Sequence, residues 1–342
     1  MYKAIVRVDG SNEIGMGHIF SELNIASKLQ NFEVLFLSKY DEGIKKLKEF
    51  NYTVKRIPSN YDSSQELKFI KKVNDNYRAD IIIADVLKDD YSDYCKKLSK
   101  ISKTMIVDYF GGLEVYSDIL LNWSIFEDDL IYNKQKSSTV YCLGQDYLLS
   151  KGGVGIYHDK KKEIKKEVRK VLITIGGSDR YNFTQRVVES LKNFKEVEFE
   201  IVIGSASKNK NDVLLALKEN KLKYNLIENS NDLSELIYRS DVAISAGGLT
   251  CLELATIGTP FLGLGSAVWE TKRLKKLEEL GICKYIGNNQ NFDEKNLYAE
   301  FSNLIHNFDI RNKMSINGKK FLDGKGVDRI IKVIGDVVKH EN

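Results

Sequence analysis

The sequence predicts an α/β protein made of two domains, each built on a parallel β-sheet. Its 342 residues are more than one ordinary hydrophobic core accommodates. Continuous apolar segments alternate with amphipathic helical segments, which is typical of strands buried on both faces by helices. The alternation stops once, at the glycine- and lysine-rich residues 152–169, and then restarts. We therefore expect a linker there, between domains at residues 1–155 and 168–322.

The first domain is predicted from the order of its segments. Apolar runs indicate strands at "YKAIVRVD", "FEVLFLSK", "YTVKRIP", "ADIIIADV", "KTMIVDYF", "SDILLNW" and "TVYCLGQDYLL". Helical spacing indicates helices at "HIFSELNIASKLQ", "DEGIKKLKEFN", "SSQELKFIKKVNDNY" and residues 91–100. The serines at the start of "SSQELKF" are placed to cap their helix.

The second domain repeats the alternation without repeating the sequence. Strands are expected in "KVLITIGG", "EFEIVIGSAS", "YNLIENS", "VAISAGG", "TPFLGLG" and "ICKYIG". Helices are expected after the glycines of the first and fourth of these strands, at "DVLLALKEN", "NDLSELIYRSD" and "ETKRLKKLEEL", and over most of residues 296–340.

Composition excludes several classes of protein. The net charge is +4, from 52 basic and 48 acidic residues, and the basic stretch at residues 159–170 has acids interleaved, so no nucleic-acid groove is indicated. The four cysteines are scattered without a C-x-x-C pair, which argues against a zinc site or a disulfide framework. The N-terminus resembles a strand rather than a signal peptide, and no apolar run is long enough to span a bilayer. We therefore expect a cytoplasmic protein without an integral membrane segment.

Three segments share the order strand, small-residue turn, helix: "VRVDGSNEIGMGH", "VLITIGGSDRYNFT" and "VAISAGGLTCLE". Ligands of open α/β sheets bind at the carboxyl ends of the strands, where helix N-termini suit phosphate groups. None of the three is a P-loop, and "GSNEIGMG" lacks the dinucleotide G-x-G-x-x-G spacing. Each turn is a candidate phosphate site, and the alternative is a tight turn without a ligand.

His18 follows the first of these turns and is one of four histidines in the chain. An imidazole can take or give a proton near neutral pH, so His18 is a candidate for acid–base catalysis. Asp9, Asp85 and Asp108 lie at or near strand ends and are candidates to orient the ring or to contact a sugar hydroxyl. The alternatives are a histidine that caps or packs, and solvated turn carboxylates.

Glu253 is expected in the first turn of the helix that follows Gly247 and Gly248. A carboxylate there can accept hydrogen bonds from both hydroxyls of a ribose while the turn holds a diphosphate. The alternative is that it only complements the helix dipole.

Taken together, the motifs resemble a known family. They are "RVDGSNEIGMGH", "DILLNWSIFEDDLIY", "CLGQDYLL", "VLITIGGSDRYNFTQ", "SAGGLTCLELATIGTP" and "LEELGI", in family order over about residues 3–285. They are similar to the UDP-sugar hydrolase of pseudaminic acid biosynthesis (PseG) and to the spore-coat polysaccharide protein G, both relatives of the lipid II glycosyltransferase MurG.

The resemblance implies the GT-B architecture. Two Rossmann-like domains would face an interdomain cleft, and a C-terminal helix at residues 323–342 would pack back toward the N-terminal domain. It also implies release of UDP from UDP-2,4-diacetamido-2,4,6-trideoxy-β-L-altropyranose by water attack at the anomeric carbon, for nonulosonic acid or surface polysaccharide synthesis. No metal or other cofactor is implied, and the oligomeric state stays open.

The resemblance also implies roles for residues. His18 matches the proton-transfer histidine of the family's G-x-G-H motif, and the segment 227–237 matches the neighbourhood of the uracil. The residues expected to bind the substrate are Asp9, Gly15, Gly17, Asp85, Asp108, Gly176, Gly177 and Ser178. The residues expected to bind the nucleotide are Ser245, Gly247, Gly248, Leu249, Thr250 and Glu253.

The sequence departs from the family on the side that faces the sugar. The usual Arg is missing from the residues just after His18, which include Glu22, and Tyr109 stands where a second acid is common. Trp269, Glu270 and Arg273 replace the usual Asn-Gln and Asn. Three functions therefore stay open: the hydrolase, an inverting glycosyltransferase with a nucleotide-sugar donor, and a non-catalytic nucleotide-sugar binding subunit.

Overall fold

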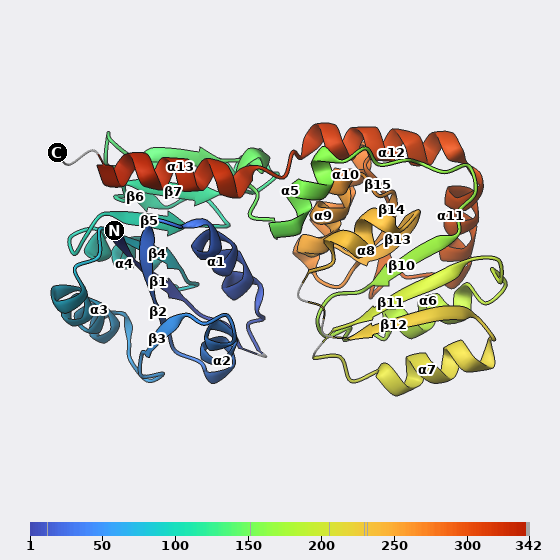
Figure 1. Ribbon diagram of the computed structural model, residues 1–342, viewed down its shortest axis with the longest axis horizontal. Coiled ribbons are helices and arrows are strands. Elements are labelled where there is room, and N and C mark those ends of the chain that lie inside the picture. Colours follow the sequence, from blue (N-terminus) through green and yellow to red (C-terminus); the bar gives the residue numbers. More distant parts are fainter. Residues whose placement is uncertain (12, 151, 205, 229, 231, 340–342) are drawn as a thin grey trace. The chain divides into compact units, whose positions relative to one another are not determined.

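The computed structural model describes residues 1–11, 13–150, 152–204, 206–228, 230 and 232–339. The chain divides into two units, one made of Met1–Leu149 and Lys325–Asn342 and the other of Ser150–Gly324 (Figure 1). Each unit has its own parallel sheet and its own buried core.

Unit 1 contains a seven-stranded parallel sheet of order β3-β2-β1-β4-β5-β7-β9. Its strands are β1 (Tyr2–Val8), β2 (Phe32–Ser38), β3 (Thr53–Arg56), β4 (Ile81–Asp85), β5 (Thr104–Val107), β7 (Ile119–Asn122) and β9 (Val140–Leu143). A separate two-stranded sheet pairs β6 (Glu114–Val115) with β8 (Asn133–Lys134). The inner strands are apolar on both faces because helices cover both.

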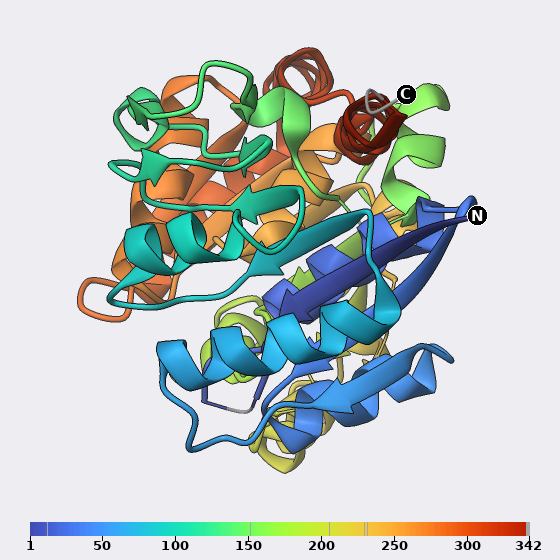
Figure 2. The same ribbon diagram turned by 90° about the vertical axis from the view of Figure 1, so that its left-hand side faces the viewer.

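The helices of unit 1 form two groups, and the contacts between helices lie within each group (Figures 1 and 2). They are α1 (Gly17–Lys28), α2 (Asp41–Glu49), α3 (Ser63–Tyr77), α4 (Tyr91–Leu98) and α13 (Gly326–Lys339), with short 3₁₀ turns at Glu127–Leu130 and Gln145–Tyr147. Helix α1 contacts α2 and α13, whereas α3 contacts α4 and shares a core with it under the sheet. The residue that caps α3 is Asp62 in a capping box with Gln65, not a serine as predicted, because its carboxylate reaches the backbone of the third helical residue.

Helix α13 belongs to unit 1 although it lies at the far end of the chain. Its buried Ile330, Ile334 and Val338 recur every four residues and form one apolar stripe. The helix packs against α1, where Lys28 pairs with Asp328 at 2.6 Å. Residues 340–342, which the predicted C-terminal helix included, lie outside the described part of the chain.

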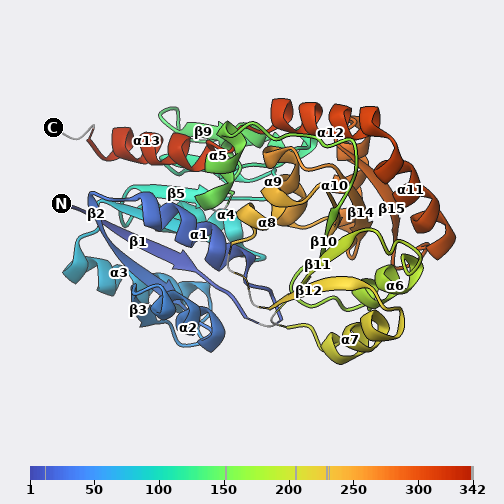
Figure 3. The same ribbon diagram turned by 45° about the vertical axis from the view of Figure 1, so that its right-hand side comes forward.

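Unit 2 contains a six-stranded parallel sheet of order β12-β11-β10-β13-β14-β15 (Figure 3). Its strands are β10 (Lys170–Thr174), β11 (Glu198–Ile203), β12 (Lys223–Glu228), β13 (Val242–Ala246), β14 (Phe261–Gly265) and β15 (Cys283–Asn288). The central strands β13 and β14 are buried along their whole length.

The helices of unit 2 include one that the sequence analysis missed. They are α5 (Gly152–Asp159), α6 (Phe183–Ser190), α7 (Lys210–Glu219), α8 (Ser234–Arg239), α9 (Leu249–Ile257), α10 (Val268–Glu279), α11 (Glu294–His306) and α12 (Phe308–Phe321). Helix α5 occupies the first half of the predicted linker and contacts α8 and α9. Its glycines allow close packing, since the position where a Cβ would stand on Gly155 lies 3.0 Å from the carbonyl oxygen of Gly324.

Each large sheet reverses its strand order at one point, and the candidate sites described below lie at these two points. In unit 1, β1 has β2 on one side and β4 on the other, so the loops that follow β1 and β4 start next to each other. In unit 2, β10 lies in the same way between β11 and β13. Loops that follow such a pair of strands leave a crevice at their carboxyl ends, which is where ligands bind in open α/β sheets.

Candidate functional site

The first candidate site lies at the carboxyl ends of β1 and β4. Val8, the last residue of β1, is in register with Asp85, the last residue of β4. The loop after β1 closes on itself through backbone hydrogen bonds between Ser11 and Gly15, and Gly15 adopts a φ of +85° that a side chain would strain. Helix α1 then starts at Gly17, which makes His18 its second residue.

His18 is held by a buried carboxylate. Its Nδ1 lies 2.8 Å from Oδ1 of Asp85, which is fully buried, while the histidine side chain is 18% exposed. The hydroxyl of Tyr109 donates to both oxygens of Asp85, at 3.0 and 3.1 Å, and lies 3.1 Å from the same Nδ1. Asp85 therefore fixes the ring through Nδ1, and Nε2 is left for a ligand.

The electrostatics of His18 stabilise its protonated form relative to a free imidazole. Burial lowers its pKa, but the charge and hydrogen bond of Asp85 and the charge of Asp9 outweigh burial, and the pKa is raised above 6.5. Tyr109 stays neutral, because burial and the nearby Asp85 raise its pKa well above 10. The three side chains form a unit that can accept a proton at Nε2 and stabilise the resulting imidazolium.

Asp9 and Asp108, which were expected to line the site, make contacts that shape its loops. Asp9 accepts a hydrogen bond from Arg7 at 2.6 Å and another from the backbone N–H of Lys39 at 2.8 Å. Asp108 accepts from the N–H of Gly111 at 2.7 Å and from the hydroxyl of Tyr132 at 2.7 Å. Both carboxylates thus tie strand ends to the loops beside them.

A network of buried charges supports the end of β1. Arg7 is 1% exposed and contacts Glu66 at 2.7 Å, and Lys39 and Lys88 reach the same carboxylate at 2.8 and 3.2 Å. Burial raises the pKa of Glu66, but Arg7, Lys39 and Lys88 outweigh burial and lower it to about 2. Each charge has a close partner, which is the condition under which a charged group tolerates burial.

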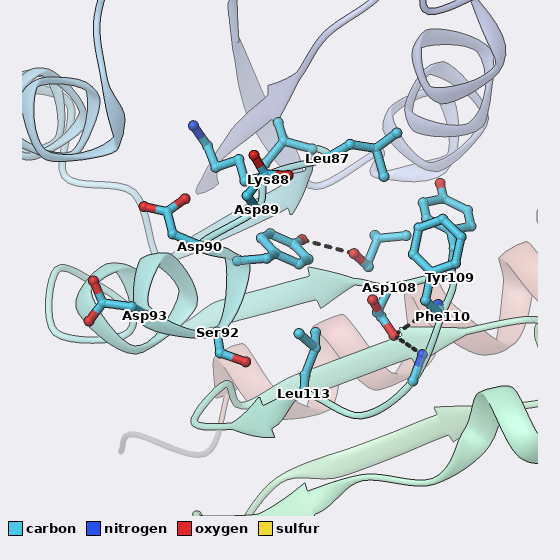
Figure 4. A pocket seen from close by; sticks show the side chains of 14 residues that line it. Leu87, Lys88, Asp89, Asp90, Ser92, Asp93, Asp108, Tyr109, Phe110 and Leu113 are labelled. Carbon is cyan, nitrogen blue, oxygen red and sulfur yellow. Dashed lines mark hydrogen bonds between the residues drawn. The ribbon is translucent and has the colours of Figure 1, made fainter.

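A pocket of about 680 Å³ opens beside Tyr109 (Figure 4). It is lined by residues 86–93, in the loop after β4 and the first turn of α4, by residues 107–111, at the end of β5 and in the loop after it, and by Leu113. Asp89, Asp90 and Asp93 contribute carboxylates, and Phe110, 73% exposed, contributes an aromatic face. Carboxylates and an exposed ring suit a ligand with hydroxyl or amide groups and an apolar face, such as a sugar.

The second candidate site lies at the carboxyl ends of β10 and β13. Gly176, with φ of +78°, and Gly177 and Ser178 follow β10, whereas Gly247 and Gly248 follow β13. Gly248 is the N-cap of α9, with no side chain hydrogen-bonded there and no acid in the first turn, so the first N–H groups of α9 are available to a phosphate. The predicted nucleotide residues Leu249 and Thr250 are the first two residues of this helix.

Two of the predicted nucleotide residues are buried. Glu253 is the fifth residue of α9, not part of its first turn as expected, and it is 3% exposed. The difference arises because Gly248 is extended, so the helix starts at Leu249 and its second turn faces inward. Ser245 is fully buried within β13, and its hydroxyl donates to the carbonyl of Ala246.

The three residues that depart from the family lie on α10, beside the same turn. The position where a Cβ would stand on Gly247 lies 2.6 Å from the carbonyl oxygen of Glu270, so only glycine fits there. Arg273 donates to the carbonyl of Gly247 at 3.0 Å, and its guanidinium lies 5.0 Å from the ring centre of Trp269, which is 55% exposed. Glu270 accepts from the N–H of Ser266, and burial raises its pKa.

The segment expected near the uracil is described only in part, since Asn229 and Asn231 lie outside the described residues. The described remainder includes the end of β12 and the start of α8, where Asp232 accepts from the N–H of Ser234 at 2.8 Å. In the part of the chain that the structure covers, no helix combines the length and apolarity needed to cross a bilayer. Among the same residues, no group of three His, Cys, Asp or Glu side chains is arranged to hold a metal ion.

Sequence reasoning missed Glu22 as a residue of the first site and treated Tyr109 only as a departure. Glu22 lies four residues after His18, on the face of α1 that also carries Ile19 and Leu23, and it is fully buried. A carboxylate within an apolar helix stripe, one turn from a candidate catalytic histidine, was the signal available. For Tyr109 there was none, because its contact with His18 spans 91 positions.

Comparison with known proteins supports the resemblance. Residues 171–263 match the glycosyltransferase family 28 C-terminal domain. The spore coat polysaccharide biosynthesis protein SpsG of Bacillus subtilis is 25% identical over 339 residues, which are 97% of this chain and 98% of that protein. Both alignments include the glycine turn that precedes α9.

Two solved structures show the same fold. MurG of Acinetobacter baumannii superposes with a TM-score of 0.70 at 15% identity, over 98% of this chain and 99% of its own. The UDP-GlcNAc 2-epimerase of Neisseria meningitidis, bound to UDP-GlcNAc, superposes with a TM-score of 0.64 at 15% identity, over 98% of this chain and 100% of its own. The chain thus has the GT-B fold and is similar to the spore coat polysaccharide protein SpsG over nearly its whole length, and residues 171–263 of unit 2 match the glycosyltransferase family 28 C-terminal domain.

Proposed function

We propose that the protein is a nucleotide-sugar enzyme in which His18 activates an oxygen nucleophile. The observation that carries this proposal is the 2.8 Å contact between Nδ1 of His18 and the buried carboxylate of Asp85, at the point where the strand order of the sheet reverses. A histidine oriented in this way accepts a proton at Nε2. An exposed pocket beside Tyr109 supplies room for a sugar or an acceptor.

The proposed reaction breaks the bond between the anomeric carbon and a nucleoside diphosphate. The nucleophile's oxygen bonds to the anomeric carbon as its proton passes to Nε2 of His18, and the diphosphate departs with the bonding electron pair. Asp85 stabilises the imidazolium that forms. The diphosphate would lie against the N-terminus of α9, where Gly247 and Gly248 leave the backbone accessible, and Glu253 would bind the ribose. UDP is the proposed nucleotide, in line with the epimerase that shares the fold and binds UDP-GlcNAc.

Two nucleophiles fit this chemistry. The first is water, which would make the protein a hydrolase that releases UDP from a 2,4-diacetamido-2,4,6-trideoxyhexose, as the resemblance to PseG implies. The second is a hydroxyl group of another molecule, which would make it a glycosyltransferase. The transferase is favoured at least as much by the match to a glycosyltransferase family domain and by a pocket larger than water requires.

One experiment separates the two. The protein is incubated with a panel of UDP-sugars, and UDP is measured with and without candidate acceptor sugars. Stoichiometric release without an acceptor indicates the hydrolase, whereas slow release that an acceptor accelerates indicates the transferase. Release that persists unchanged in His18→Ala would remove His18 from either mechanism, and binding without release under any condition would indicate a binding subunit.

A further inference from the structure

Glu22 is a buried carboxyl group without a visible partner. It is 0% exposed, and neither side-chain oxygen has a hydrogen-bond partner among the described residues. It lies on α1 four residues after His18, so both side chains are on the same face of the helix. Buried carboxyl groups are otherwise paired or hydrogen-bonded, as Glu66 is in the same unit.

The charged groups around Glu22 come from several elements. The charge of Asp85, at the end of β4, contributes to raising the pKa of Glu22, and Asp85 and Glu22 both contribute to raising the pKa of Tyr109, which follows β5. Asp9 after β1 forms an ion pair with Arg7, and where α13 packs on α1, Asp328 forms an ion pair with Lys28. Burial and the charge of Asp85 raise the pKa of Glu22 well above 4.5, which favours its uncharged form.

An uncharged acid at this position is costly for the fold. A buried polar group without a partner destabilises a protein, whereas an apolar side chain of the same shape does not. The neighbouring residues Ile19 and Leu23 show that α1 packs apolar side chains here without difficulty. A residue kept against this cost is a candidate for a role in the site beside it.

We propose that Glu22 is a positioning residue of the His18 site, a carboxylic acid whose uncharged form adds no second negative charge beside Asp85 in the buried cluster of His18, Asp85 and Tyr109. When Glu22 ionises at alkaline pH, a second negative charge is placed beside Asp85. The repulsion between the two carboxylates then disrupts the contact between Asp85 and His18. This inference rests on the proposed function for its role in catalysis, but the ionisation itself can be observed without a substrate.

The test follows the ring signal of His18 by NMR in the free protein, with histidine labelled at Cε1 and the signal assigned through His18→Gln. The wild type should show one step as His18 titrates and a second, alkaline step as Glu22 loses its proton. In Glu22→Gln, which keeps the shape but cannot ionise, the first step should stay within about 0.3 units and the second should vanish. Tyr109→Phe is the control that should retain the alkaline step.

Two further measurements separate this role from simple packing. In kcat/KM for UDP release, Glu22→Gln should exceed the wild type by about tenfold one pH unit above the wild type's alkaline midpoint. Glu22→Met should raise Tm by about 2–4 °C, because it removes an unpartnered polar group, and should also lose the alkaline NMR step.

Several results would overturn the proposal. An alkaline NMR step that persists in Glu22→Gln would assign it to another group. A pKa of His18 lowered by a unit or more in that variant would mean that Glu22 is charged, and a lower Tm in Glu22→Met would mean that Glu22 makes a stabilising contact. If the NMR steps follow Glu22 but no UDP-sugar is turned over, the proposed function fails while the inference about Glu22 stands.

Discussion

The two candidate sites have the same position in their sheets and opposite chemistry. Each follows the pair of strands at which the strand order reverses, β1 with β4 and β10 with β13. The first is crowded with titratable side chains, among them His18, Asp85 and Glu22, whereas α9 at the second has no acid in its first turn and is buried only from Cys251 to Ile257. We therefore propose that the same topology supports proton chemistry in one unit and backbone recognition of an anion in the other. Titratable side chains dominate the first site, whereas glycines and helix N–H groups dominate the second.

The largest effect should come from His18. Replacing it with Ala should lower kcat for UDP release by about 10²–10⁴-fold, because general base catalysis contributes that much. UDP binding measured by calorimetry should stay within about twofold, since the proposed nucleotide site is in unit 2. His306→Gln, an exposed histidine at the end of α11, is the matched control and should change neither value. A large loss of UDP affinity in His18→Ala would break the division of roles between the sites.

Asp85→Asn should lower kcat by about a hundredfold and also lower the pKa of His18. The carboxylate of Asp85 raises the pKa of His18, whereas burial lowers it. Without that carboxylate the pKa of His18 should fall, and the acidic limb of the pH–rate profile should move to lower pH. The NMR titration of His18 checks the shift directly. An unchanged pKa would mean that the 2.8 Å contact is not an ionic one in solution.

Acidic pH should lower the free energy of unfolding of unit 1, because Glu66 becomes protonated. Its pKa is lowered to about 2, so its contribution to stability is complete above about pH 4.5 and is lost as the pH falls toward 2. The shift corresponds to about 3 kcal/mol of unfolding free energy. Trp123 is buried in unit 1 and Trp269 lies in unit 2, so a Trp269→Phe background isolates the fluorescence of unit 1 in urea titrations at several pH values. Glu66→Gln should be less stable than the parent at neutral pH and should respond less to acid.

Gly247→Ala tests the second site and should have the smallest effect. The new Cβ would meet the carbonyl oxygen of Glu270 at 2.6 Å, so the turn must shift, at a cost of about 1–3 kcal/mol. We expect UDP affinity to fall about tenfold or more while the pKa of His18 stays unchanged. Gly335→Ala on α13, where a Cβ meets nothing within 4 Å, is the control and should be neutral or slightly stabilising. Wild-type affinity in Gly247→Ala would remove this turn from the nucleotide site.

Local patterns predicted the elements well, because strands and helices depend on nearby residues. The two parallel sheets and the strand–turn–helix order at both sites follow from apolar runs and glycines. Helix α5 was not predicted because its glycines are typical of a linker. The contacts that make glycine necessary there are with residues distant in the sequence. The start of α9, and so the burial of Glu253, depends on the backbone conformation of Gly248, which sequence does not specify.

The histidine was predictable from its place after a strand, but its surroundings were not. Tyr109 is 91 positions away from His18 and Asp85 is 67 positions away, so only the folded sheet brings them together. Asp9 and Asp108 were predicted at the strand ends, where they indeed lie, but local sequence did not reveal that their oxygens are engaged by Arg7 and Tyr132. Position along the chain thus indicated which residues to consider, and packing determined what each one contacts.

Helix α13 has a consequence for the order in which the protein is made. It packs against α1, the helix that presents His18, yet it is translated only after the whole of unit 2. The ribosome therefore releases the first 149 residues long before the segment that completes their fold. During synthesis, α1 lacks one of its covering helices, and the surface that α13 later buries is open to chaperones or to a second nascent chain. The packing of α1, the helix that carries His18, is therefore completed only after unit 2 has been synthesised.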